Sequence, residues 1–174
     1  MHRRDLLKLG ASLAFSGAAI PAAWAQEAAK QAAKPNWRPA VLSAHENETV
    51  ITLTDLIIPS TDTPGAKTAR VNRYIDLLLR DGPLEQRERF IGGLAWLDNY
   101  AIREHGHAFV KCAPAEQVAI LKALDEGQGP GHVFFHQIKS LTSRIYYATE
   151  IGYQELNKGG RVPASFACDH ASHG

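Results

Sequence analysis

Apolar residues recur at helical spacing along most of the chain after Ser43. The clearest stripe falls at i, i+3, i+4, i+7 and i+8 of one helix face: Val71, Tyr74, Ile75, Leu78 and Leu79. The whole pattern predicts about five helices. These are one between Ser43 and Pro59, one carrying that stripe, one from about Leu84 to Glu104, one from Pro114 through Leu124, and one from about His132 to Lys158. No alternating strand pattern stands out, so the sequence predicts an all-α compact bundle with an irregular C-terminal tail over 161–174.

Local signals mark where these helices begin and end. Ser43 and Glu46 form a capping-box signature, in which each side chain can accept a hydrogen bond from a free backbone N–H. Pro59 should end the first helix, because the residue before a proline disfavours the helical conformation. Pro114 occupies a favoured first helical position, and Gly159-Gly160 is a typical stop signal.

Residues 1–25 have the features of an export signal. Arg3 and Arg4 precede an apolar stretch, Leu9 to Ile20, which at about a dozen residues is too short to span a bilayer as a helix. Ala23-Trp24-Ala25 is a small-x-small cleavage site. We therefore expect a twin-arginine signal peptide, cleaved after Ala25, and a periplasmic protein that crosses the membrane already folded. An ordinary secretory leader and an uncleaved anchor are the alternatives.

Residues 26–42 are predicted to be a linker between the signal peptide and a helical domain over 43–174. The first half is rich in Ala, Gln and Lys and shows no clear apolar face, and two prolines follow it. Trp37 and Val41 are the side chains that could dock this segment on a surface. A flexible spacer after the cleavage site is the simpler interpretation.

Charge and composition exclude several classes of partner. The chain has a formal net charge of +1, so nothing indicates a basic surface for nucleic acid or anionic lipid. After the leader, no apolar run approaches membrane-spanning length. The length of the remaining chain suits one domain with a real core.

Catalytic and cofactor motifs are scarce. Glu104-x-x-His107 is the one match to the pattern of a di-iron bundle, which needs two such pairs. The chain has no Cys-x-x-Cys-His for covalent haem, no Gly-x-Gly-x-x-Gly and no Gly-x-Ser-x-Gly. We therefore predict no catalytic and no cofactor-binding residue in this chain.

The C-terminal tail holds one cluster of metal-ligating residue types. Cys168, His170 and His173 are weak candidates for zinc ligands, because their spacing is nonstandard and a fourth ligand is needed. They support an alternative function, a stand-alone periplasmic metal-binding protein or enzyme. The other histidines that could contribute are His105, His107, His132 and His136. A helical domain of unrelated role is a third alternative.

Cys112 and Cys168 are the two cysteines of the chain. Export would bring them into an oxidising compartment, where they could pair with each other, pair with another chain, or stay free. Sequence cannot choose among these states, because a disulfide requires a specific distance between the two Cα atoms.

The segment 57–76, IIPSTDTPGAKTARVNRYID, is predicted to form a rigid turn between two helices. Pro59 and Pro64 restrict its backbone, Asp62 or Thr63 could cap the following helix, and Gly65 permits a close backbone approach. Thr61 completes the polar run between the prolines.

The same segment resembles the hallmark of the gluconate 2-dehydrogenase subunit 3 family. The matching residues are Ile58 through Ala66, Val71 and Tyr74-Ile75-Asp76. Further similarity lies at Gly93-Leu94, Leu97-Asp98, the helix over 117–124, Phe134-Phe135, and the tail with Cys168 and His170, where Ala167 replaces the usual Gly. The resemblance covers most of residues 43–170.

This resemblance implies a noncatalytic subunit that accompanies a large dehydrogenase of the glucose-methanol-choline type. The large subunit would hold FAD and oxidise a sugar, sugar acid or polyol, and a cytochrome c subunit often takes the electrons. That subunit commonly lacks an export signal and crosses through the twin-arginine translocase bound to its small partner, so membrane association would come through the complex. Aromatic residues that could anchor the interface are Trp96, Tyr100, Phe134, Tyr146, Tyr147 and Tyr153. The loop from Thr61 to Gly65 could belong to the interface or be a structural corner.

Overall fold

The computed structural model describes residues 20–157, which contain seven α-helices, one short 3-10 helix and no strand. The all-α class is confirmed. The elements are α2 (Ala22–Ala32), α3 (Ala44–Ile57), α4 (Val71–Asp81), α5 (Leu84–His105), η1 (Phe109–Lys111), α6 (Pro114–Glu126), α7 (Pro130–Ala148) and α8 (Glu150–Leu156). No helix in this part of the chain is long and apolar enough to cross a membrane.

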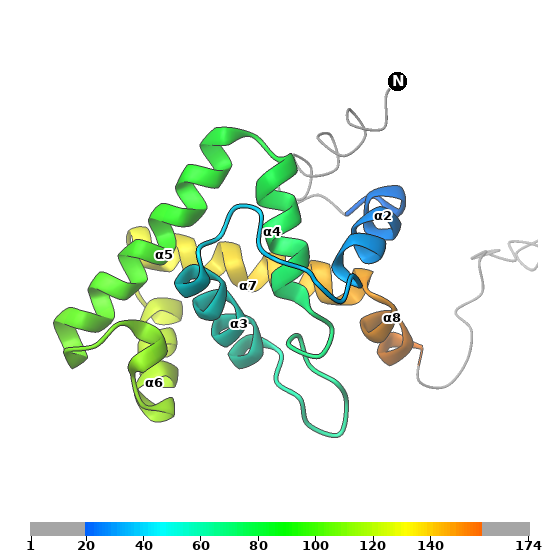
Figure 1. Ribbon diagram of the computed structural model, residues 1–174. Helices are drawn as coiled ribbons and strands as arrows, with labels where there is room; N and C mark the ends of the chain where they lie inside the picture. The colour runs from blue at the N-terminus through cyan, green and yellow to red at the C-terminus, as the bar shows by residue number, and fades with distance from the viewer. Residues whose placement is uncertain (1–19, 158–174) are drawn as a thin grey trace, which may run out of the picture.

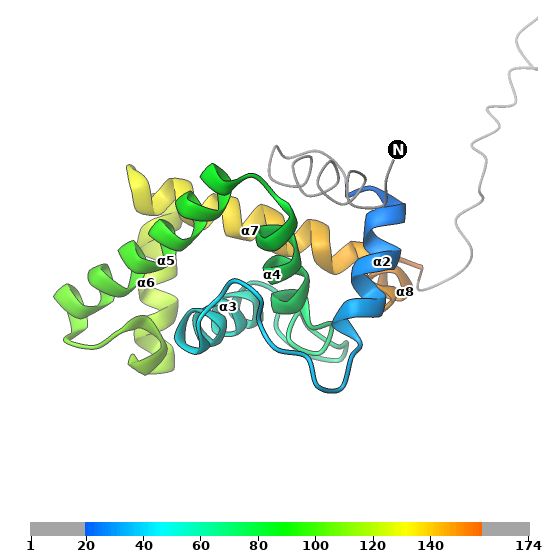
Figure 2. The same ribbon diagram turned by 45° about the horizontal axis from the view of Figure 1, so that its top comes forward.

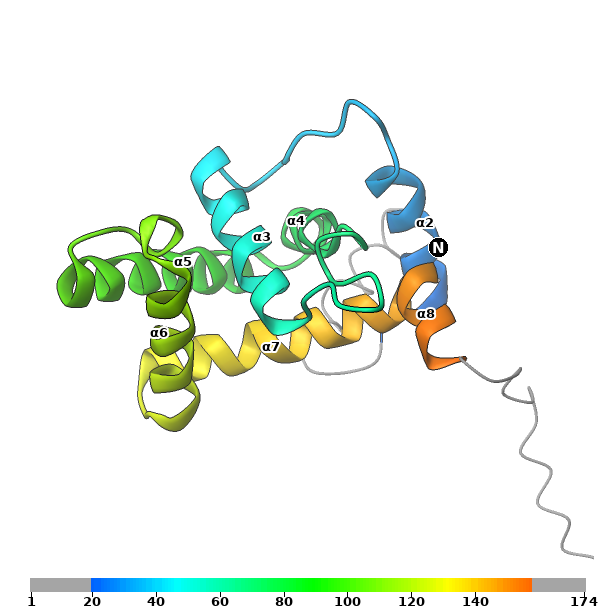
Figure 3. The same cartoon turned by 90° about the horizontal axis from the view of Figure 1, so that it is seen from below.

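Helix α7 runs through the length of the molecule and organises the others (Figure 1). It contacts α3, α4, α5, α6 and α8. Helices α5 and α6 lie at one end, and α2 and α8 lie at the other, as the view from below also shows (Figure 3). Helix α4 lies between these two ends and also contacts α2, α3 and α5 (Figure 2).

The core forms where α4, α5 and α7 meet. The apolar stripe of α4 is buried as predicted, and Leu94 and Leu97 of α5 and Ile138 and Tyr146 of α7 are buried with it. One glycine allows α5 and α7 to approach closely, because a Cβ at Gly93 would fall 2.1 Å from the ring of Phe134. The two helices can therefore meet this closely only with glycine at that position.

Three predicted helix boundaries are confirmed. The Ser43 Oγ accepts from the N–H of Glu46 at 3.2 Å, while the N–H of Ser43 donates to the Glu46 carboxylate at 2.7 Å. Helix α3 ends at Ile57, just ahead of Pro59, and α6 begins at Pro114.

The prediction of one long last helix is wrong, because two helices occupy its place. Thr149 takes an extended conformation (φ −82°, ψ 159°) and separates α7 from α8. Its hydroxyl donates to the carbonyl of Tyr146 at 2.6 Å and accepts from the N–H of Gly152 at 3.2 Å, which caps α8. Gly152 fits this corner because a Cβ there would lie 2.1 Å from the Tyr146 carbonyl oxygen.

Residues 26–42, predicted to be a linker, include most of α2 and a backbone stretch that docks on α4. Helix α2 does have an apolar face, made by Trp24, Ala28 and Ala32, all of which are buried. After the helix, the backbone N–H groups of residues 40–42 all donate to the carboxylate of Asp76. This stretch is therefore packed on the helical domain along much of its length.

Candidate partner-binding surface

The loop between α3 and α4 is closed on itself by hydrogen bonds that two of its backbone N–H groups donate. The N–H of Ala66 donates to the carbonyl of Ile58 at 2.8 Å, and the N–H of Gly65 donates to the Ser60 hydroxyl at 2.9 Å. A Cβ at Gly65 would fall 2.5 Å from the backbone of Ile58 and Ser60. The predicted close approach at Gly65 is confirmed, and it explains why glycine is needed where the loop crosses itself.

Helices α7 and α8 anchor one side of this loop. The Tyr146 hydroxyl donates to the carbonyl oxygen of Pro64 at 2.6 Å and lies 2.5 Å from a carboxylate oxygen of Glu155. The other carboxylate oxygen of Glu155 accepts from the Thr63 hydroxyl at 3.0 Å. Burial, and then the Glu155 carboxylate, raise the pKa of Tyr146 to about 12. The loop is thereby tied to residues far along the chain.

The tip of the loop is left exposed. Thr61 and Asp62 are exposed to solvent. Within residues 20–157 their side chains make no hydrogen bond that would hold the loop in shape. The expectation that Asp62 or Thr63 caps the next helix is wrong. The N-cap of α4 is Arg70, in the left-handed conformation (φ 58°), and no side chain caps it.

Two further acidic residues from the matching segments hold the backbone together. Asp76 is fully buried and accepts from the N–H groups of Ala40, Val41 and Leu42 at 2.7, 3.0 and 3.0 Å. Asp98 accepts from the N–H of Phe109 at 3.0 Å, and its other oxygen lies 2.5 Å from Nε2 of His45. Both carboxylates act as structural acceptors for segments distant in sequence.

The six aromatic candidates for interface anchors divide into three groups. Phe134 and Tyr146 are core residues, so they cannot anchor a partner. Trp96 and Tyr100 are half-buried and stack with ring centroids 5.3 Å apart. Tyr147 is 43% exposed and Tyr153 is 62% exposed, so these two are the candidates most accessible to a partner.

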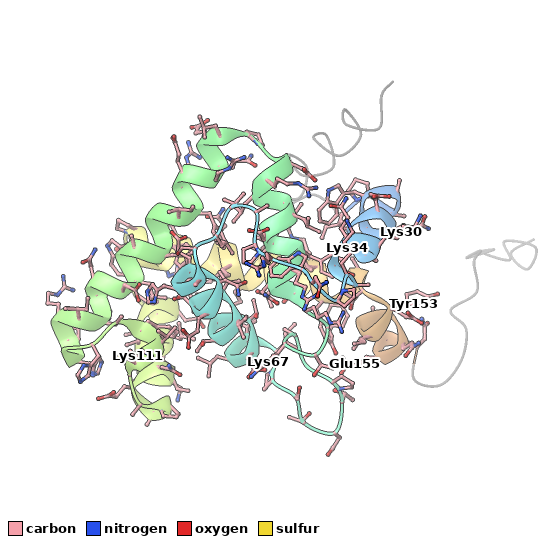
Figure 4. All side chains as sticks on the ribbon, in the orientation of Figure 1. Lys30, Lys34, Lys67, Lys111, Tyr153 and Glu155 are labelled. Atoms are coloured by element: carbon pink, nitrogen blue, oxygen red, sulfur yellow. The ribbon has the colours of Figure 1, made fainter. Side chains whose placement is uncertain are left out.

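A groove of about 530 Å³ separates α2 from the C-terminal end of α7 and from α8. Tyr74, Tyr147 and Tyr153 line it with small residues of α2, including Ala25 and Ala29. Figure 4 shows Lys30 and Lys34 of the α2 side and Tyr153 and Glu155 of α8 at the same end of the molecule. This end combines exposed aromatic rings, charged side chains of both signs and the anchored loop.

The histidines do not build a metal site in the part of the chain that the structure describes. Rings of His132 and His136 lie 4.2 Å apart, but Nδ1 of His132 contacts the Leu124 carbonyl and His136 pairs with Asp125 at 3.2 Å. No group of three or more His, Cys, Asp or Glu side chains within residues 20–157 could hold a metal ion. The tail candidates Cys168, His170 and His173 lie outside the described residues.

Cys112 is buried beside η1. Its Sγ contacts the carbonyl oxygens of His107 and Ala108 at 3.6 and 3.7 Å, and burial raises the pKa of the thiol. The proposed partner Cys168 lies outside the described residues, as do Arg3 and Arg4 of the export signal. Ala25, the predicted cleavage position, lies within α2.

Sequence reasoning did not find Glu155 or the role of Asp76. A glutamate in a short polar helix resembles any solvent-facing residue, and its contact with Thr63 spans 92 positions. Asp76 stood within the family-like segment, but no local pattern indicates that its carboxylate gathers three N–H groups. Trp24 lies in a small-x-small pattern typical of a cleavage site, and this pattern obscures its helical spacing with Ala28 and Ala32.

The described residues thus define an all-α domain in which most of the motif residues make contacts within the fold itself. One end of the domain carries the exposed tyrosines and the anchored loop. A family model for gluconate 2-dehydrogenase subunit 3 matches residues 44–160. The chain belongs to this family, and membership implies a subunit of a multi-subunit dehydrogenase complex. Searches of curated proteins and of solved structures gave no significant match.

Proposed function

We propose that this chain is the noncatalytic small subunit of a periplasmic, FAD-dependent dehydrogenase acting on a sugar, sugar acid or polyol. The observation that carries the proposal is the family match over residues 44–160. FAD would be held by a large flavoprotein of the glucose-methanol-choline type, and a cytochrome c subunit could accept its electrons. The chain stabilises the flavoprotein by binding its folded state.

The surface proposed for the flavoprotein is the end formed by the loop tip, α8 and the C-terminal end of α7. Exposed tyrosines supply large contact area at low entropic cost, and aromatic residues are enriched at interface centres. Thr61 and Asp62 are exposed on a loop that Tyr146 and Glu155 hold in place. A preformed loop loses little conformational freedom on binding, which favours affinity.

The proposed export role is that this chain, which carries the Arg3-Arg4 signal, brings the flavoprotein across the membrane with it. A flavin subunit must fold around FAD in the cytoplasm, and the twin-arginine route carries folded proteins. A partner without a signal of its own could therefore cross bound to this chain. Replacing both arginines with lysine should leave both subunits in the cytoplasm, and continued export of the pair would contradict this role.

Co-expression with a flavoprotein of the glucose-methanol-choline type tests the association. We expect higher flavoprotein yield and FAD content when this chain is present, and equal values with and without it would sink the proposal. Tyr153→Ala should weaken co-purification more than Val133→Ala does. The two side chains are 62% and 65% exposed, but Val133 lies at the opposite end of the molecule, on the first turn of α7.

The metal-binding alternative makes a different prediction. The proximity of His132 to His136 is the one feature within residues 20–157 that favours it. Stoichiometric zinc, iron or copper in the purified full chain would support that alternative. A metal-free chain that co-purifies with a yellow subunit would support the association.

A further inference from the structure

Helix α2 places the predicted cleavage point inside folded structure. The bond between Ala25 and Gln26 lies in the first half of the helix, and the N–H of Ala25 already donates to the Pro21 carbonyl at 3.0 Å. A protease binds its substrate as an extended strand, so a bond in a packed helix is cut only after that helix opens locally. The stability of α2 therefore decides whether the site is used.

The apolar face of α2 is built into the core. Trp24 is only 3% exposed, and its ring centroid lies 6.5 Å from that of Tyr74 on α4. Ala28 and Ala32 follow at intervals of four residues and are equally buried. Cleavage after Ala25 would remove Trp24 from this cluster and expose the apolar surface of Tyr74 that it covers.

Polar contacts fix the other half of the helix to α4. Arg73 donates to the carbonyl oxygens of Ala32 and Lys34 at 2.7 and 3.2 Å. Arg80 donates to the side-chain oxygen of Gln31 at 2.8 Å. These bonds hold the C-terminal end of α2 in place, while Trp24 holds the turn that contains the scissile bond.

Cleavage would also leave an unfavourable charge. A new amino group at Gln26 would place a positive charge at the N-terminus of the shortened helix, where the helix dipole is positive as well. A chain exported after folding would reach the processing protease with α2 already packed.

We propose that the Ala25–Gln26 bond stays intact and that α2 remains part of the exported protein, held closed by Trp24. Trp24 belongs to the domain in this view, and the small-x-small pattern around it is a site that folding conceals. This inference goes beyond the proposed function, since it concerns the covalent form of the chain and requires no partner.

The direct test is to measure the intact mass and the N-terminal sequence of the protein in the periplasmic fraction that is released when spheroplasts are formed. We expect every chain to retain residues from Pro21 onward. An N-terminus at Gln26, or anywhere after Pro21, would overturn the proposal. Ala23→Gln changes an exposed residue and destroys the small-x-small pattern, so the mass should differ from wild type by that substitution alone.

A second test works on the purified full chain with leader peptidase in detergent, and it does not depend on export. Trp24→Ala leaves Ala23 and Ala25 in place but removes the buried ring, so cleavage after Ala25 should be at least about tenfold faster than in wild type. Lys30→Ala, an exposed change on the same helix, should match wild type. Equal rates in wild type and Trp24→Ala would overturn the protective role of Trp24. Failure of export alone would count against the proposed function and leave this comparison intact.

Discussion

The hydroxyl of Tyr146 donates a hydrogen bond to the carbonyl oxygen of Pro64 at 2.6 Å, across 82 positions of the chain. The same hydroxyl lies against Glu155, which in turn accepts from Thr63. One buried tyrosine therefore connects α7 and α8 to the loop that carries the most specific part of the family resemblance. The shape of that loop depends on residues that follow it by most of the domain.

Tyr146→Phe should destabilise the chain by about 1–3 kcal/mol, because it leaves the carbonyl of Pro64 and the carboxylate of Glu155 without their shared partner. Urea unfolding followed by circular dichroism measures this change. Tyr147→Phe, which alters the exposed neighbouring ring, is the matched control and should have little effect. Equal stability of the two variants would show that the hydroxyl contacts contribute nothing.

The same substitution should change the dependence of stability on pH. The pKa of Tyr146 is raised to about 12 in the folded protein, against an ordinary value of 10. The contribution of its hydroxyl is therefore complete below pH 10 and is lost as the pH rises through 12. The difference in unfolding free energy between wild type and Tyr146→Phe should narrow over this interval. A constant difference would mean that Tyr146 ionises alike in both states.

Two adjacent glycines of α5 should respond oppositely to alanine. Gly92→Ala meets no atom within 4 Å and should stabilise the helix by about 0.5–1 kcal/mol. Gly93→Ala would drive a Cβ into the ring of Phe134 and should cost about 1–3 kcal/mol. Thermal unfolding of the two variants gives the comparison. A stable Gly93→Ala protein would contradict the close approach of α5 and α7.

Two aspartates of the matching segments should also differ sharply. Asp76→Ala removes the buried carboxylate to which the N–H groups of Ala40, Val41 and Leu42 all donate, so we expect a loss of at least about 3 kcal/mol. Asp62→Ala, at the exposed loop tip, should change stability by less than about 0.5 kcal/mol. Chemical unfolding tests both. A large loss for Asp62→Ala would assign that residue to the fold instead of the partner surface.

Most of the helical pattern could be predicted because its signals are local. The capping box at Ser43, the proline after α3 and the stripe of α4 each act within a few residues of the boundary that they set. The break at Thr149 carried a local signal too, since threonine is a favoured N-cap and Glu150 follows in the first turn. The apolar residues on both sides of Thr149 continue at helical spacing, however, and this spacing favours one continuous helix over a break at that residue.

The anchored loop could not be predicted, because its partners are distant in sequence. Nothing near Glu155 indicates that its carboxylate meets Thr63, and nothing near Pro64 indicates that its carbonyl meets a tyrosine of α7. The apolar face of helix α2 could not be predicted for another reason. Alanine gives little contrast between the faces of a helix, so Ala28 and Ala32 did not stand out as a buried stripe.

The distance in sequence between Pro64 and Tyr146 also sets an order of events during synthesis. The chain emerges from the ribosome N-terminal end first, so α3, the loop and α4 appear long before α7 and α8. The loop cannot take its anchored form until residues up to Glu155 have emerged. A nascent chain that ends before Glu155 lacks the contacts that shape the loop, so a partner that binds the shaped loop would bind only after α8 has emerged.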